Sequence, residues 1–125
     1  MKSDGSATPF AFVLDELHSI HPVVRRMFGM TYLYCEETLL LAIRDSARKP
    51  DTNGVWLYTQ AEHLESLRRE FPLLPGHYFW KSGKNGWVIL ASKLEYFEEY
   101  VLHACELIVH GDHRIGRVSR GAMVG

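Results

Sequence analysis

Apolar residues near the N-terminus recur at the spacing of a helix. The positions i, i+3, i+4 and i+7 are occupied by Phe10, Val13, Leu14 and Leu17, which is typical of one buried helix face. Thr8-Pro9 provides an N-cap hydroxyl and a proline in the first turn. The helix is expected to end at His21, because a residue that precedes proline favours extended backbone.

Two apolar runs then predict paired strands. They cover residues 23–35 and 38–43, with Glu36-Glu37 between them as a tight turn. Gly29 interrupts the first run and indicates a bulge or a bend. Both alternating faces are apolar in residues 32–35 and 39–43, whereas a strand exposed on one side alternates apolar with polar residues. Either helices cover both faces of the sheet, or an uncovered face meets another protein.

A polar loop and a second helix follow. Residues 44–54 offer almost nothing to bury and predict the longest and most mobile loop of the domain. A short aromatic strand is expected over residues 55–58. Thr59 and Glu62 have the spacing of a capping box, which predicts a helix that starts there. Leu64, Leu67 and Phe71 form its inner stripe.

The last part of the chain predicts a hairpin and a long helix. Strands over residues 77–81 and 87–91 flank Asn85-Gly86, the strongest hairpin signal in the sequence. A second capping box, Ser92 with Glu95, opens a helix that ends near Gly111.

These elements predict an α+β domain in the order α-β-β-β-α-β-β-α. Its five-stranded sheet is mainly antiparallel, and the helices pack against it. The domain covers residues 9–111, with a flexible N-terminus over residues 1–8 and a loosely held tail over residues 112–125.

Composition narrows the class of protein. The chain has 125 residues, enough for one core, and a net charge of −1. This balance argues against a protein that coats nucleic acid through bulk electrostatics. No apolar run is long enough to cross a bilayer, and residues 1–8 lack the pattern of a secretory signal. We therefore expect a cytoplasmic protein with no membrane partner.

The candidate chemical groups do not converge in the sequence. The densest histidine cluster, residues 110–113, stands where a helix gives way to the tail. Cys35 and Cys105 each have core-like neighbours, which favours buried reduced thiols over a disulfide. Glu36-Glu37 and Glu98-Glu99 are adjacent pairs whose side chains diverge. No phosphate-binding glycine loop is present. The sequence predicts no catalytic residue, no cofactor and no metal.

Basic and aromatic residues are the more informative candidates. Arg25 and Arg26 begin a strand, and Lys81, Lys84 and Trp87 surround the second hairpin. A basic hairpin with exposed aromatic rings suits a nucleic-acid groove or stacking on bases. In the alternative interpretation, Lys84 is a solvent-exposed loop charge and the tryptophans belong to the core. The last helix carries only acidic charges, so DNA would have to bind away from it.

Two stretches carry a resemblance to known families. Arg25-Arg26-Met27-Phe28-Gly29, followed by Tyr32-Leu33-Tyr34 and the apolar run 39–43, resembles the start of the TfoX N-terminal domain family. Residues 64–72, Pro75-Gly76 and the final helix look more like the MmcQ/YjbR-like family. The second glycine of the Met-Phe-Gly-Gly motif is Met30 here. The resemblance implies a small α+β fold and provides no catalytic residue.

Three functions follow as hypotheses. The leading one is a non-enzymatic protein-interaction module linked to transcription or competence regulation, as the TfoX resemblance implies. The second is direct DNA binding of the kind suspected for the MmcQ/YjbR-like group, through Arg25, Arg26, Lys81, Lys84 and Trp87. The third is a small-molecule binder or an unrecognised enzyme, with a pocket lined by Tyr58, Tyr78 and Trp80. The partner is expected to be a protein, and a homodimer is one form that the contact could take.

Overall fold

A single antiparallel sheet organises the chain. The computed structural model describes residues 10–118. Six strands lie side by side in the order β1-β2-β3-β4-β6-β5, and a short seventh strand pairs with the start of β3. The strands are β1 (Val23–Met27), β2 (Met30–Cys35), β3 (Thr38–Arg44), β4 (Gly54–Gln60), β5 (Phe79–Ser82), β6 (Asn85–Ala91) and β7 (Arg117–Val118).

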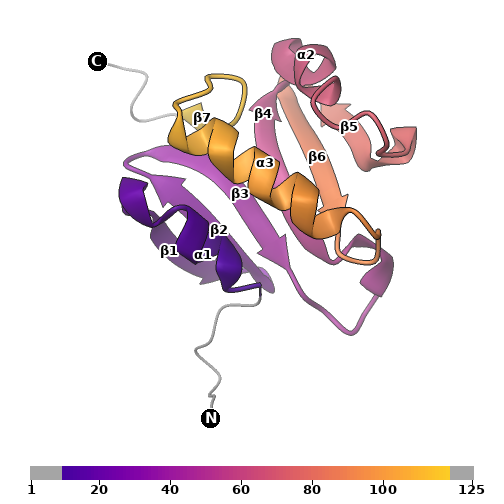
Figure 1. The fold of residues 1–125 in the computed structure, drawn as a ribbon, viewed down its shortest axis with the longest axis horizontal. Helices are drawn as coiled ribbons and strands as arrows, with labels where there is room; N and C mark the ends of the chain where they lie inside the picture. The colour runs from indigo at the N-terminus through magenta and orange to yellow at the C-terminus, as the bar shows by residue number, and fades with distance from the viewer. Residues whose placement is uncertain (1–9, 119–125) are drawn as a thin grey trace.

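The α-helices of the described residues lie on one face of this sheet (Figure 1). They are α1 (Phe12–Glu16), α2 (Leu64–Arg68) and α3 (Phe97–Val109). Figure 1 shows α1 and α3 lying across the sheet. The Arg68 guanidinium of α2 lies over the Phe79 ring, 4.6 Å from its centroid, and Phe71 packs against Tyr100 of α3. The core between the layers contains fully buried aliphatic side chains such as Leu33, Leu41, Leu57 and Val88. No helix within residues 10–118 has the length and apolar character needed to cross a bilayer.

The α+β class is confirmed, but the prediction of five strands is wrong. The apolar run 23–35 forms two strands, because Phe28 and Gly29 turn the chain between Met27 and Met30. Both turn residues have positive φ, 56° and 75°, as a two-residue hairpin turn requires. Phenylalanine rarely adopts this conformation, so Gly29 indicated a bulge or a bend and not a two-residue turn. The expected turn at Glu36-Glu37 does join β2 to β3.

Both predicted capping boxes are wrong. Thr59 lies inside β4, fully buried, and its hydroxyl donates to the carbonyl of Arg114 instead of capping a helix. Three 3-10 residues, Ala61–His63, precede α2. Helix α3 begins at Phe97, several residues after Ser92, and no side chain caps it. The Thr8-Pro9 cap predicted for the first helix lies outside the described residues.

Two loops also differ from the expectation. The second hairpin turns at Gly83-Lys84, since Ser82 pairs with Asn85, and Asn85-Gly86 belongs to β6. The loop over residues 45–53 is held by Arg44, which donates to the Asn53 side chain at 2.7 Å and to the backbone carbonyls of Lys49 and Arg48. This loop therefore has internal hydrogen bonds that the sequence did not indicate, and its mobility stays a prediction.

The segment after Gly111 is fixed to the domain, at least as far as Val118. Arg114 donates to Asp112 and Glu70, both at 2.7 Å, and to the Ser66 hydroxyl at 3.1 Å. His103 of α3 contacts the other oxygen of Glu70 at 2.8 Å. We call this group, Ser66, Glu70, His103, Asp112 and Arg114, the Arg114 cluster. It corrects the prediction of a loose tail for residues 112–118, whereas residues 119–125 lie outside the described residues.

The first prediction concerns the close approach of two strands. Gly54 has φ +142°, and a Cβ there would overlap the Leu90 carbonyl oxygen and lie 2.9 Å from the Ser92 nitrogen. Gly54→Ala is expected to lower the free energy of unfolding by about 3 kcal/mol or more, because backbone atoms would have to move. Gly29→Ala is the control: it has positive φ but nothing within 4 Å, so about 1 kcal/mol is expected. Urea denaturation measures both, and equal losses would contradict the close approach.

The second prediction concerns acid stability. The hydrogen bond from Arg114 lowers the pKa of Asp112 to about 2, and hydrogen bonds from His103 and Arg114 lower the pKa of Glu70. A carboxylate with a lowered pKa stabilises the fold fully above its ordinary pKa of about 4 and loses that contribution as the pH falls. Arg114→Met should therefore cost about 2–3 kcal/mol at neutral pH and flatten the loss of stability below about pH 5. Parallel stability curves for the two proteins between about pH 5 and 2.5 would contradict it.

Candidate functional site

The sheet face away from the helices carries a row of large aromatic side chains. Strand pairing places Arg25, Tyr32, Ala42, Trp56 and Ile89 side by side across five strands. A second row joins Tyr58, Trp87 and Trp80. Paired residues in neighbouring strands point to the same side of a sheet. We call the surface formed by Tyr32, Tyr34, Trp56, Tyr58, Trp80 and Trp87 the open face.

The rings of the open face pack on one another. Trp87 contacts Trp56 edge-on with ring centroids 5.8 Å apart, and Tyr58 with centroids 4.5 Å apart. The Tyr58 hydroxyl donates to the Asn85 side chain at 2.9 Å, and the Trp56 indole N–H donates to the Thr52 carbonyl at 2.8 Å. With the polar atoms of Tyr58 and Trp56 paired, these packed rings form an apolar surface.

The β1 edge adds a positive charge and exposed apolar side chains. The Arg25 guanidinium lies 5.6 Å from the centroid of the Tyr34 ring, within the range of a cation–π contact. Partial burial raises the pKa of Tyr32, and the neighbouring Tyr34 raises it further. At the tip of the hairpin, the Phe28 side chain is 88% exposed. This edge therefore leaves an aromatic ring and a cation accessible to a partner.

The residues predicted for nucleic-acid or partner contact do not form one cluster. Arg25 and Trp87 lie on the open face. By strand alternation, Arg26 and Lys81 point to the helix side of the sheet, and Lys84 lies in the β5–β6 turn. Strands β1 and β5 are opposite edges of the sheet (Figure 1), separated by five steps and so by about 24 Å. The predicted basic residues therefore lie in two distant groups.

Sequence reasoning included only Trp87 of this surface among the predicted contact residues. Tyr58 and Trp80 were assigned to a pocket, and Tyr32, Tyr34 and Trp56 to no site. The apolar character of both strand faces left open whether helices or a partner cover the second face. The alternation of Tyr32 with Tyr34, and of Trp56 with Tyr58, was the available signal, because residues two apart in a strand share a face. The strand order was needed to bring the two pairs together.

The exposed surface of helix α3 is acidic. Glu98, Glu99 and Glu106 are exposed on α3, as the acidic pattern of this helix predicted. The loop beside Trp56 carries Arg48 and Lys49 together with Asp45 and Asp51, so its charges balance. Nothing in this distribution produces a continuous positive path across the open face.

The histidines and cysteines have separate environments. His110 Nδ1 lies 2.8 Å from the Glu106 carbonyl, whereas His113 packs edge-on against His63. Among the described residues, no three of the His, Cys, Asp and Glu side chains lie close enough together to hold a metal ion. Burial raises the pKa of Cys105 to about 12, so this thiol is protonated and a poor nucleophile at neutral pH.

The pocket suggested for Tyr58, Tyr78 and Trp80 does not bring these residues together. The Tyr58 hydroxyl reaches Asn85, where β6 begins. Tyr78 is buried beside Lys93, which follows the end of β6. The two tyrosines therefore lie at opposite ends of this strand.

The third prediction uses the placement of the three tryptophans, all of which lie on the open face. Trp80 is 41% exposed, whereas Trp56 and Trp87 are half-buried. Trp80→Phe should therefore lower the slope of acrylamide quenching of the intrinsic fluorescence, because it removes the most accessible ring. Trp56→Phe is the control and should leave the slope equal or higher. An unchanged slope in Trp80→Phe would show that Trp80 is covered.

Comparisons of the chain with protein-family models, with curated proteins and with solved structures found no match. The resemblance to the TfoX N-terminal domain and MmcQ/YjbR-like families thus stays a prediction, based on the motifs quoted above.

Proposed function

We propose that this chain is a protein-interaction module and that its partner binds the open face. The observation that carries the proposal is the set of packed aromatic rings on a sheet face that no described helix covers. Tryptophan, tyrosine and arginine supply most of the binding energy at protein interfaces. Trp80 and Arg25 place two of these residue types on the open face.

A protein partner fits this surface better than nucleic acid does. A nucleic acid needs several cations that follow its phosphates, but Arg25 and Lys84 stand at opposite edges of the sheet. Protein interfaces instead have an apolar, aromatic centre with charges at the rim, and this is the distribution on the open face. The module as proposed performs no chemical step.

The resemblance to the TfoX N-terminal domain family points to the process in which the partner would act. Regulators of that family are associated with transcription and competence through protein contacts. By this resemblance, we propose a cytoplasmic partner that belongs to transcription control. A second copy of the chain is the other protein that the open face would accept.

The fourth prediction tests the partner and its site together. The chain is used to capture proteins from a native lysate treated with nuclease. Trp80→Ala and Arg25→Ala should each reduce capture by about fivefold or more, since truncation of a tryptophan or arginine that anchors an interface costs at least about 1 kcal/mol. Leu102→Ala is the matched control: its side chain is 42% exposed on α3, on the other side of the sheet, and capture should be unchanged.

Two results would contradict this proposal, and a third would identify the partner. Equal capture by the Trp80→Ala variant would remove the open face as the site. Loss of the partner on nuclease treatment, with direct DNA binding that weakens steeply as salt increases, would support the nucleic-acid alternative. Concentration-dependent dimers in light scattering, lost in Trp80→Ala, would identify the partner as a second copy.

A further inference from the structure

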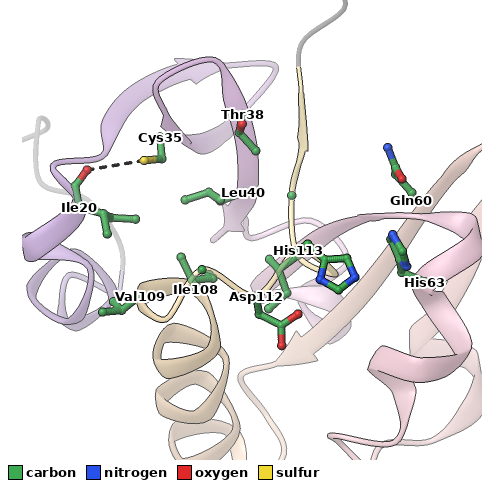
Figure 2. A pocket seen from close by; sticks show the side chains of 13 residues that line it. Ile20, Cys35, Thr38, Leu40, Gln60, His63, Ile108, Val109, Asp112 and His113 are labelled. Carbon is green, nitrogen blue, oxygen red and sulfur yellow. Dashed lines mark hydrogen bonds between the residues drawn. The ribbon is translucent and has the colours of Figure 1, made fainter. Parts of the chain in front are cut away.

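A cavity of about 540 Å³ lies where helix α3 ends, on the helix side of the sheet. Figure 2 shows it between the start of β3, the residues before α2 and the segment that follows α3. Its volume lies in the range of small-molecule sites. The cavity is separate from the open face, so a ligand bound in it would be distinct from the partner protein of the proposed function.

One end of the cavity is apolar. Leu40 and Ile108 are buried in its wall, and Ile20 and Cys35 close this end (Figure 2). Leu40 faces the cavity because of an irregularity in β3: Leu33 pairs with Leu41 and Tyr34 with Leu39, so Leu40 is an extra residue. Such bulges redirect side chains and are common beside binding sites. The wall is thus largely apolar, with the Cys35 thiol and the Thr38 hydroxyl as its polar groups.

The other end is polar but holds no cation that is always charged. His63 and His113 lie together there, with ring centroids 5.0 Å apart, and Gln60 is nearby (Figure 2). Imidazole and amide groups both donate and accept hydrogen bonds. They can hydrogen-bond polar heads of different charge, so the charges around them decide which head is favoured.

The surrounding charges favour a neutral or positive head. The C-terminal end of α3, at Val109, borders the cavity and carries the negative end of the helix dipole. The Glu62 carboxylate lies 3.4 Å from His63 Nε2. Asp112 also lines the cavity, and its partner Arg114 is shared with Glu70. An anion would meet these negative groups without a dedicated cation.

We propose that this cavity binds a small amphiphile with an aliphatic body and a hydroxyl or ammonium head. The body lies against Leu40 and Ile108, and the head reaches His63 and His113. The partner protein of the open face is not needed for this binding.

The fifth prediction uses Cys35 as a reporter in the cavity wall. Its thiol donates to the Ile20 carbonyl at 3.7 Å. Cys105 is buried and protonated, so modification of the folded chain by iodoacetamide reports on Cys35. Octanol and octylammonium should slow this modification in a saturable manner. Octanoate has the same body and a negative head, and its affinity should be lower by about threefold or more.

Matched variants on one helix provide the control. Val109→Phe fills the mouth of the cavity from a residue that is 38% exposed, and it should abolish protection by octanol. Leu102→Phe adds a ring at a comparably exposed position of α3 outside the cavity and should leave protection intact. Trp80→Ala should also leave it intact, which separates this test from that of the proposed function. Saturation-transfer NMR from the protein to the octyl chain should give the same ranking.

Several outcomes would overturn the proposal. One is the absence of both protection and saturation transfer with octanol and octylammonium. Equal affinity for octanoate would refute the electrostatic selection of the head, and full protection of Val109→Phe would place the ligand elsewhere. If deletion of residues 119–125 is required before octanol protects Cys35, the chain itself occupies the cavity.

Discussion

The sheet is apolar on both faces, but a single layer of helices packs against it. Helices α1 and α2 have five residues each and α3 has thirteen, so the longest spans about 20 Å. Together they cover one face. The other face is shielded by its own aromatic side chains, since Ala42 and Ile89 are buried in the row that contains Tyr32 and Trp56. The protein therefore obtains a second apolar layer from rings instead of from another helix.

The two proposed sites follow from this division. The open face is a product of strands alone, and its rings occupy fixed positions because strand pairing sets the register. The cavity depends on the helix layer, because it forms where α3 stops short and the chain returns to the sheet. The Arg114 cluster holds that returning segment through Glu70 and Ser66. A partner on the open face and an amphiphile in the cavity would thus contact different layers of the domain.

Much of the fold was accessible from local patterns. Apolar runs located the regions of β1 to β6, although residues 23–35 were interpreted as one strand. The Glu36-Glu37 turn and the α3 stop near Gly111 were correctly placed. The failures have two causes: distant partners that compete with local signals, and residues in conformations that their side chains disfavour. Thr59 has the residue type of an N-cap, but its hydroxyl is used by the Arg114 carbonyl, 55 residues away. Phe28 turns the chain although its side chain disfavours that conformation. In the candidate site, alternation along the strand places Tyr32 and Tyr34 on the same face. Only the strand order shows that Arg25 and Lys84 lie at opposite edges of the sheet.

The position of β7 has a consequence for synthesis of the protein. During translation, residues leave the ribosome in chain order, at about 5–20 per second. The hairpins of β1 to β3 can pair early, because their contacts are close in sequence. The start of β3, however, pairs with β7 only after Val118 has emerged. Thr59 and Glu70 likewise need Arg114, which lies 55 and 44 residues further along the chain. The nascent domain thus exposes an incomplete sheet edge beside the future cavity until the final stage of its folding.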